Sequence, residues 1–273
     1  MSGKALRLKR IVSPVDGRAV IFPLDHGVSW GPLPGLERIA GVIDTGVKAG
    51  ADAIVLHKGM LRCLEPARGA LPGIIMHLSA STSMGPAFYH KILAGSVEEA
   101  VRRGADAVSV QVTLGDTREP EMLRDLGRVG RSCEEWQIPL LVMAYAGGDR
   151  MQASATGADI AHAARVAAEL GADVIKIPFP GDYDQLAGIV SGLPVPVVIA
   201  GGSPSGGIDC FLERIEMSVK AGAAGVAAGR GIFQHEDTGA ILRAVCDIIH
   251  RGVSAGKIME DMQAKAKTWT KRT

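Results

Sequence analysis

Aromatic side chains are scarce in this sequence of 273 residues, and its positive and negative charges nearly cancel. Phe, Trp and Tyr together make up 4% of the chain, and the formal net charge is +1. Few rings are therefore available to stack on bases, and no overall positive field attracts a polyanion. We expect no nucleic acid partner.

Cysteines and long apolar runs are also few. The chain has four cysteines, at Cys63, Cys133, Cys210 and Cys246. They are far apart and include no Cys-x-x-Cys pair, which is typical of reduced thiols in a cytoplasmic protein. No apolar run approaches the ~18 residues of a membrane span, and the basic segment at residues 4–10 lacks the apolar core of a secretory signal. We expect a cytoplasmic protein that contacts no membrane.

A repeat of glycine, alanine and aspartate or alanine, followed by apolar residues, occurs four times. The copies begin at Gly50, Gly104, Gly171 and Gly222. The residues before each glycine have the apolar spacing of a helix, and those after it form an apolar run. Each glycine therefore predicts a left-handed helix cap that leads into a buried strand.

Four further apolar runs complete a set of eight predicted strands. They cover residues 19–24, 73–78, 139–144 and 196–200. Helices are predicted over residues 36–49, 96–103, 120–136, 157–170, 183–191, 209–221 and 236–252, and a loop with weaker helical character over residues 60–71. Strands that are apolar on both faces, alternating with helices at roughly 34 residues a unit, are typical of a (β/α)8 barrel.

We therefore predict an α/β fold, a single (β/α)8 TIM barrel over residues 1–273, with a short N-terminal extension and a charged C-terminal helical tail. An open doubly wound sheet is the alternative, but no Gly-x-Gly-x-x-Gly turn follows the first predicted strand. Barrel enzymes place their chemistry at the carboxyl ends of the strands. The residues that end each predicted strand are therefore the candidate site.

Two lysines end predicted strands and are candidate nucleophiles. Lys176 lies within Val-Ile-Lys-Ile-Pro, and we expect burial and the nearby cation Arg230 to lower its pKa, as a Schiff-base lysine requires. The alternative is a lysine that reaches past the strand end to solvent, or one ion-paired with Asp25. Lys58 is the rival nucleophile, but Gly59 follows it and suggests a solvated turn.

Two glycine loops on neighbouring predicted strands indicate a phosphate site. They are Gly201-Gly202-Ser203 and Gly229-Arg230-Gly231. Glycines let backbone N–H groups approach an anion, and Arg230 adds a bidentate charge. The alternative is that these glycines only make tight turns.

Histidines and a tyrosine also end predicted strands. His26, His57 and His77 end the first three and could converge on a metal ion. Their spacing matches no specific metal motif, so the alternative is that they hydrogen-bond to backbone or substrate, and we assign no metal and no cofactor. Tyr145 ends the fifth strand, next to the strand of Lys176, and is either a half-buried phenol or a proton donor.

These residues resemble a known group, the Schiff-base (class I) aldolase family of archaeal-type fructose-bisphosphate aldolases and 2-amino-3,7-dideoxy-D-threo-hept-6-ulosonate synthases. The matching motifs run in order over nearly the whole chain: Pro23-Leu24-Asp25-His26-Gly27-Val28-Ser29, His57-Lys58-Gly59, the stretch from Gly171 to Lys176, Ala200-Gly201-Gly202 and Ala228-Gly229-Arg230.

The resemblance implies a role for each matched residue. It makes Lys176 the imine-forming residue, Tyr145 the proton donor and Asp25 the base. It also implies that a phosphosugar contacts His26, Gly27, Val28, Ser29, Ala146, Gly147, Gly201, Gly202, Gly229 and Arg230. By the same resemblance we expect a homo-oligomer that works on small phosphosugar and aldehyde substrates.

Two departures from the family pattern bear on the substrate. The archaeal synthases carry Pro-Arg-Gly after the tyrosine, where this chain has Ala146-Gly147-Gly148, and Pro-Lys after the glycines of the seventh strand, where it has Ser203-Pro204-Ser205. Fewer cations imply different anionic groups on the substrate. A bacterial relative that joins aspartate semialdehyde to dihydroxyacetone phosphate, towards an aminohydroxybenzoate, fits these changes.

The resulting hypothesis is a lysine-dependent aldolase or transaldolase that joins a ketose-phosphate donor to aspartate semialdehyde. The donor is dihydroxyacetone phosphate or a deoxyhexodiulose phosphate. The alternatives are a fructose-1,6-bisphosphate aldolase, a metal-dependent barrel enzyme that uses the strand-end histidines, and a phosphosugar-binding barrel without catalysis.

Overall fold

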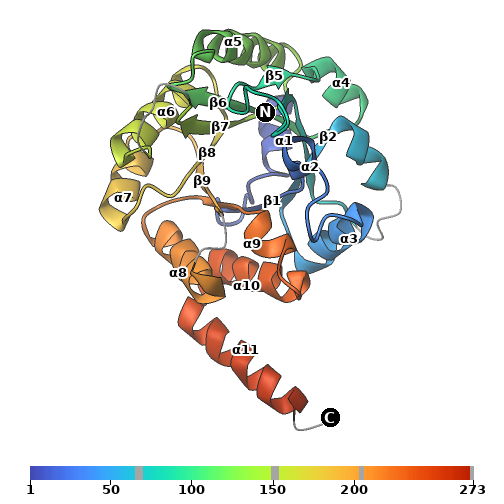
Figure 1. Ribbon diagram of the computed structural model, residues 1–273, viewed down its shortest axis with the longest axis vertical. Helices are drawn as coiled ribbons and strands as arrows, with labels where there is room; N and C mark the ends of the chain where they lie inside the picture. The colour runs from blue at the N-terminus through green and yellow to red at the C-terminus, as the bar shows by residue number, and fades with distance from the viewer. Residues whose placement is uncertain (65–69, 149–153, 203–205, 271–273) are drawn as a thin grey trace.

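A closed parallel barrel forms the centre of the computed structural model, which describes residues 1–64, 70–148, 154–202 and 206–270 (Figure 1). Its strands lie in the order β1-β10-β9-β8-β7-β6-β3-β2. They are β1 (Ala19–Pro23), β2 (Ala53–His57), β3 (Gly73–His77), β6 (Ala107–Leu114), β7 (Leu140–Ala146), β8 (Val174–Ile177), β9 (Val197–Ala200) and β10 (Gly225–Ala227). The predicted TIM barrel is confirmed, and each strand overlaps a predicted apolar run, although β6 and β7 extend beyond the carboxyl ends of theirs.

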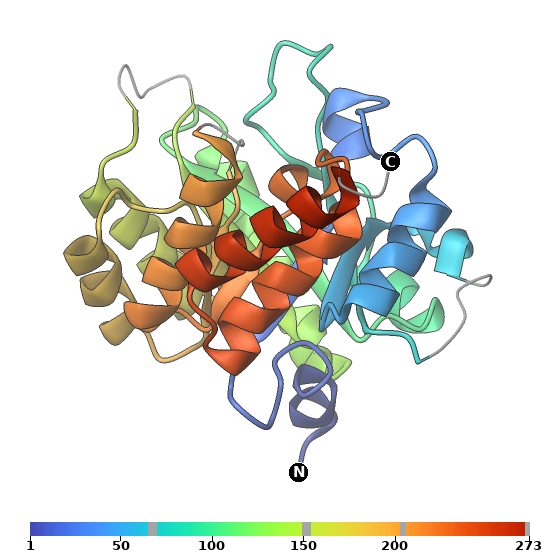
Figure 2. The same ribbon diagram turned by 90° about the horizontal axis from the view of Figure 1, so that it is seen from below.

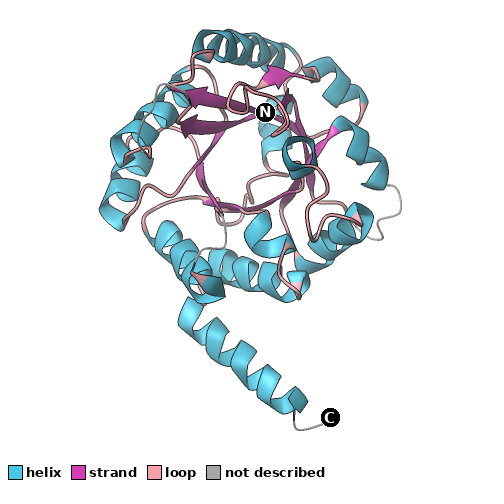
Figure 3. Cartoon of the chain, viewed as in Figure 1, coloured by secondary structure: helices cyan, strands magenta, loops and turns pink. Residues whose placement is uncertain are grey.

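A ring of helices surrounds the barrel (Figure 3). The helices that follow strands are α3 (Ile39–Ala49), α4 (Val97–Arg102), α5 (Glu119–Glu135), α6 (Gly157–Glu169), α7 (Tyr183–Ser191), α8 (Gly207–Lys220) and α10 (Thr238–Arg251). Each overlaps a predicted helix and differs from it by up to three residues at an end. The start of the predicted loop over residues 60–71 is the 3-10 helix η1 (Lys58–Leu64), in keeping with the weaker helical character expected there.

Five short elements have no counterpart in the predictions. They are α1 (Gly3–Leu8), α2 (His26–Trp30), α9 (Arg230–Phe233) and the two-stranded antiparallel pair β4 (Ser79–Ala80) and β5 (Ile92–Leu93). One or two turns of helix, or two residues of strand, contain too few positions to show a periodic apolar pattern.

The four repeated glycines have the left-handed backbone that the sequence predicts. The φ angles of Gly50, Gly104, Gly171 and Gly222 are 90°, 78°, 98° and 95°. The aspartate of the repeat joins neighbouring strands: Asp52 accepts a hydrogen bond from the N–H of Val20 at 2.6 Å. Asp106 and Asp173 accept in the same way from Ile74 and Leu140, at 2.9 and 2.8 Å. The repeat therefore fixes the amino-terminal ends of the strands.

The basic N-terminal extension closes the amino-terminal end of the barrel, and Figure 2 shows α1 lying there. Arg10 forms an ion pair with Asp106 at 2.6 Å, and Lys4 forms one with Asp173 at 3.1 Å. Ile11 and Val12 pack against the side chains that fill the barrel. The basic segment is thus a structural part of the barrel.

The C-terminal tail forms α11 (Ala255–Thr270), which packs against α8. Ala255 and Ile258 are buried, and the N–H of Ala255 donates to Oε2 of Glu216 at 2.8 Å. Among the described residues, no helix combines the length and apolar character needed to cross a membrane.

Candidate active site

Two cavities open at the carboxyl end of the barrel and share four lining side chains, those of His26, Tyr145, Lys176 and Arg230. The first, which we call the histidine cavity, has a volume of about 270 Å³ and is also lined by Asp25, His57, His77, Lys91, Gln111 and Thr113. The second, the glycine cavity, has a volume of about 590 Å³ and is also lined by Phe179, Gly201, Gly202, Arg214 and Gly229.

Lys176 lies in the middle of β8 and lines both cavities. Its side chain is buried, between the buried Ile175 and Ile177 along the strand. Among the described residues, no carboxylate oxygen lies within 4.0 Å of its Nζ. The structure therefore disfavours the alternative of an ion pair with Asp25 and leaves the amine free to meet a ligand.

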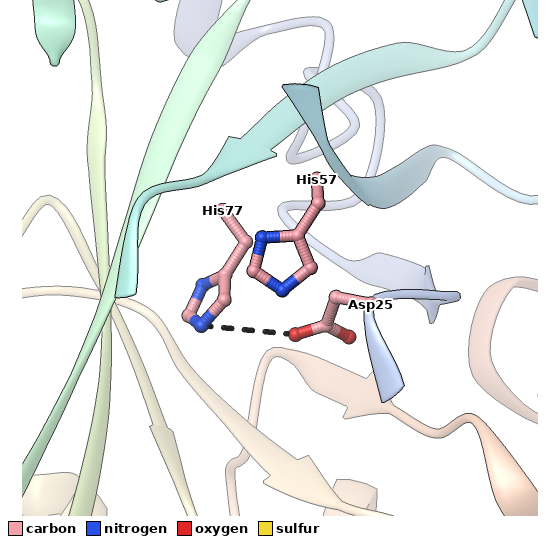
Figure 4. Close-up of side chains that lie close together, drawn as sticks. All are labelled: Asp25, His57 and His77. Carbon is pink, nitrogen blue, oxygen red and sulfur yellow. Dashed lines mark ion pairs between the residues drawn. The ribbon is translucent and has the colours of Figure 1, made fainter. Parts of the chain in front are cut away.

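Asp25 follows β1 and lies beside two histidines of neighbouring strands, His57 at the end of β2 and His77 at the end of β3 (Figure 4). Nε2 of His77 is 3.8 Å from Oδ2 of Asp25. Nδ1 of His77 is 2.8 Å from Oγ of Ser109 on β6, a contact that fixes the orientation of the ring. The rings of His57 and His77 meet edge to face, with centroids 5.2 Å apart.

Burial controls the charges in this cluster. Burial alone would raise the pKa of Asp25, but attraction to the protonated forms of His77, His26 and Lys176 outweighs it and holds the pKa at about 2. Burial lowers the pKa of His77 to about 3, against the opposing charge of Asp25. Burial lowers the pKa of His26 and His57 as well. At neutral pH the cluster is therefore one carboxylate among neutral imidazoles.

The same cluster could hold a metal ion, although not with the ligands that the sequence suggests. One donor atom each from Asp25, His57 and His77 lies within 4.8 Å of the others. Among the described residues His26 does not belong to this group, so the three strand-end histidines do not come together as one set of ligands. The ring of His26 instead meets Phe233 edge-on, with centroids 5.2 Å apart. Two neutral imidazoles and a carboxylate are suitable ligands for a transition metal.

Tyr145 lies near the end of β7, the neighbour of β8, and is half-buried. The register places Met143 of β7 beside Lys176 of β8, so Tyr145 lies two residues further towards the carboxyl end. Its side chain lines both cavities. The phenol is therefore placed to exchange a proton with a group bound at Lys176.

The glycine cavity has the features of an anion site. Gly201 and Gly202 follow β9, and Gly229 and Arg230 follow β10. A Cβ on Gly229 would lie 2.5 Å from Cε1 of His26 and 2.7 Å from the carbonyl oxygen of Pro23, so only glycine fits. Tight packing is thus one reason why glycine stands at position 229. The second is that glycine, without a side chain, leaves the cavity that it lines open. Ser203, the third residue of the predicted loop, lies outside the described residues.

The remaining sequence-predicted residues divide into two groups. Ser29 and Ala146 line the histidine cavity, whereas Gly27, Val28 and Gly147 line neither cavity. Lys58, the rival nucleophile, lies on η1, is half-exposed and pairs with Glu99 at 3.2 Å. The amine of Lys58 is thus paired with a carboxylate and lies outside both cavities.

Several lining residues were missed by sequence reasoning. Lys91 and Phe88 come from the segment between β4 and β5, and Arg214 from the middle of α8. No motif marks these positions. Thr113 had a detectable signal, because it follows Ser109 and Gln111 at the two-residue spacing of one strand face.

A TIM barrel with a buried lysine between two polar cavities is the architecture of a class I, Schiff-base-forming aldolase. The comparison with known families agrees: residues 19–235 match the DeoC/LacD family aldolases, and the chain belongs to this family.

Relatives in the family share much of this sequence. The chain is 39% identical over 253 residues to the 2-amino-4,5-dihydroxy-6-oxo-7-(phosphonooxy)heptanoate synthase of Streptomyces griseus, covering 93% of this chain and 92% of the relative. It is 39% identical over 249 residues to the 2-amino-3,7-dideoxy-D-threo-hept-6-ulosonate synthase of Halobacterium salinarum, covering 91% and 92%.

A solved structure is also similar. It is an archaeal fructose-1,6-bisphosphate aldolase whose catalytic lysine is covalently bound to the carbinolamine intermediate of the substrate. The TM-score is 0.82 at 28% identity, and the match covers 90% of this chain and 99% of that chain.

Proposed function

We propose that this protein joins dihydroxyacetone phosphate to aspartate semialdehyde in an aldol condensation that proceeds through a Schiff base on Lys176. The observation that carries the proposal is the position of Lys176, whose buried amine lines both cavities. One cavity has the glycines and arginines that suit a phosphate, and the other has a carboxylate and neutral imidazoles that suit proton transfer.

The reaction begins with attack of the neutral amine of Lys176 on the ketone carbon of dihydroxyacetone phosphate. Loss of water leaves an iminium, and removal of a proton from the hydroxymethyl carbon converts it into an enamine. This carbon then bonds to the aldehyde carbon of aspartate semialdehyde, and hydrolysis frees Lys176 and the product. Three donor carbons and four acceptor carbons give a seven-carbon phosphate, the chain length in the name of the Streptomyces griseus relative.

Asp25 and Tyr145 carry the protons. With a pKa of about 2, Asp25 is ionised at neutral pH and accepts the proton from the donor carbon. The phenol of Tyr145 donates to the oxygen of the aldehyde as the new bond forms. The iminium replaces a carbanion with a neutral enamine, so this route needs no metal.

The phosphate of the donor occupies the glycine cavity in this proposal. Arg230 and Arg214 line that cavity with Gly201, Gly202 and Gly229. Binding energy gained at the phosphate, away from the reacting carbon, orients the ketone for attack by Lys176.

The test is reductive trapping. Sodium borohydride with dihydroxyacetone phosphate is expected to inactivate the full-length protein irreversibly and to add the reduced donor to the peptide that contains Lys176. The Lys176→Met variant is expected to resist, and Lys58→Met to behave as the wild type. A label on the peptide of Lys58 or Lys91, or no label, contradicts the proposal. Condensation with aspartate semialdehyde and cleavage of fructose 1,6-bisphosphate, measured side by side, distinguish the two aldolase activities.

A metal-dependent reaction is the second candidate, and the convergence of Asp25, His57 and His77 favours it. It predicts that turnover is lost with a chelator and restored by a divalent metal, while borohydride has no effect. A phosphosugar-binding barrel without catalysis predicts saturable phosphate-dependent binding and no property that changes in Lys176→Met.

We further propose that the protein acts in the cytoplasm as a homo-oligomer. The cysteines Cys63, Cys133, Cys210 and Cys246 are all free, which suits a reducing compartment, and the family resemblance supports assembly. Size-exclusion chromatography with light scattering measures the subunit number, and a monomeric mass contradicts the expected assembly.

A further inference from the structure

Lys91 is a buried cation in the histidine cavity that has no role in the chemistry described above. It lies directly before β5, in the segment that rises over the end of the barrel opposite the N-terminus (Figure 2). Its side chain is 6% exposed and lines the cavity. Nζ donates to Oγ of Ser81 at 2.6 Å and lies 4.4 Å from the centroid of the Phe88 ring. The Ser81 hydroxyl donates in turn to the carbonyl oxygen of Phe88 at 2.7 Å.

No anion among the described residues neutralises this ammonium group directly. Within the part of the chain that the structure describes, no carboxylate oxygen lies within 4.0 Å of the Nζ of Lys91. Burial lowers the pKa of Lys91, and the charge of Asp25 opposes this effect from further away. A buried charge without an opposite charge beside it is costly, so this position suits an anion that arrives with a ligand.

The rest of the cavity has the polarity of a ligand site. Oγ1 of Thr113 is buried and has no hydrogen-bond partner among the described residues, and its side chain lines the same cavity. The lowered pKa values keep the histidines neutral at pH 7. Among the described residues of the lining, Asp25 is therefore the one formal negative charge, against the cations Lys91 and Arg230 and the iminium that forms on Lys176. The excess positive charge favours an anionic ligand.

We propose that Lys91 binds the carboxylate of the acceptor aldehyde and so selects an acidic aldehyde over a neutral one. This inference rests on the proposed function, in which the donor phosphate fills the glycine cavity. A carboxylate fits Lys91 better than a second phosphate does, because the site offers one ammonium group already bound to Ser81. The glycine cavity, in contrast, offers two arginines and several glycines.

The consequence is a substrate pair with one anion at each end and the reacting carbons between them. The phosphate lies beside Arg230 and the carboxylate beside Lys91, while Lys176 lines both cavities. The acceptor is therefore held by its carboxylate with its aldehyde towards the enamine.

The test compares acceptors and variants in the full-length protein. The acceptors are aspartate semialdehyde, 3-aminopropanal, which lacks only the carboxylate, and glyceraldehyde 3-phosphate. The variants are Lys91→Met, which keeps the length of the side chain, Lys91→Arg, which keeps the charge, and Lys58→Met as a control at an exposed ion pair. Borohydride trapping of dihydroxyacetone phosphate is measured for each variant, because it reports the donor half-reaction and an intact fold.

We expect Lys91→Met to lower kcat/KM for aspartate semialdehyde roughly 10- to 100-fold, mainly through KM, as expected for the loss of a charge-assisted hydrogen bond. Its rate with 3-aminopropanal and its donor trapping should match the wild type. Lys91→Arg should recover part of the loss, and Lys58→Met should show none. In the wild type alone, aspartate semialdehyde should exceed 3-aminopropanal by a similar factor.

Other outcomes overturn the inference. They are an equal loss with both aldehydes in Lys91→Met, no loss with either, or no preference for the acidic aldehyde in the wild type. A wild-type preference for glyceraldehyde 3-phosphate that Lys91→Met removes assigns the site to a phosphate and also overturns it. Absent donor trapping in the wild type contradicts the proposed function itself, and this result is distinguishable from all the others.

Discussion

His250 on α10 should make the stability of this protein depend on pH. Its Nδ1 is 2.7 Å from Oδ2 of Asp16, and its Nε2 is 2.9 Å from Oδ2 of Asp52. Asp52 also accepts the N–H of Val20, so the imidazolium links α10, the N-terminal extension and the start of β1. The hydrogen bond to Asp52, with a smaller effect from Asp16 and against the effect of burial, raises the pKa of His250 from 6.5 to about 9.

The sign follows from the raised pKa. The folded protein keeps the proton on His250 up to about pH 9, whereas the unfolded chain releases it near pH 6.5. The stabilisation is therefore complete below pH 6.5 and disappears as the pH rises through 9. Each pH unit between the two values is worth about 1.4 kcal/mol, and the difference corresponds to about 3 kcal/mol. Partial exposure of the three side chains reduces this to about 2 kcal/mol.

Urea unfolding followed by circular dichroism at pH 6, 7.5 and 9.5 measures the effect. The unfolding free energy of the wild type should fall between pH 6 and pH 9.5 by about 2 kcal/mol more than that of His250→Gln. His162→Gln, at an exposed position of α6, should follow the wild type. Parallel pH profiles for the wild type and His250→Gln would refute the reasoning.

Two further predictions concern the site. Tyr145→Phe should retain borohydride trapping of dihydroxyacetone phosphate but lower kcat for condensation by about 10²- to 10⁴-fold, the range for loss of a general acid. Stopped assays with aspartate semialdehyde measure this kcat, and an unchanged value excludes Tyr145 as the proton donor. Gly229→Ala should lower the unfolding free energy by about 1–3 kcal/mol and raise KM for the donor, because its Cβ would meet His26 and Pro23. Gly188→Ala in α7, where a Cβ meets open space, is the matched control, and equal melting temperatures for the two variants contradict the prediction.

The fold was predictable from sequence because its signals are local and repeated. Gly171 illustrates this: a helical apolar pattern precedes it, its φ is 98°, and a buried strand begins three residues later. The aspartate of the repeat can be seen in the sequence, but its role cannot. Asp173, for example, accepts a hydrogen bond from the N–H of Leu140, which is distant in sequence. The exact ends of helices and elements of one turn, such as α2, were missed because they contain too few residues to show a periodic apolar pattern.

The candidate site was predictable only where residues belong to strands. Lys176, Tyr145 and Asp25 could be grouped, because parallel strands bring their carboxyl ends to one edge of the barrel. Lys91 could not be grouped with them, because its position depends on the path of the chain between Ala80 and Ile92. These two residues pair as part of β4 and β5. That path is set by tertiary contacts, and the sequence contains no marker for it.

The burial that keeps the histidines neutral also shapes the chemistry proposed for the site. An iminium on Lys176 carries a positive charge that the free amine lacks, and a protonated His77 nearby would oppose its formation. With the pKa of His77 at about 3 and that of Asp25 at about 2, the cluster presents a carboxylate to the iminium throughout the neutral range. Asp25 can then stabilise the iminium before it takes the donor proton, and its charge falls at the step in which the iminium becomes a neutral enamine. Charge is thus lost from both partners together, which suits the buried position of Lys176.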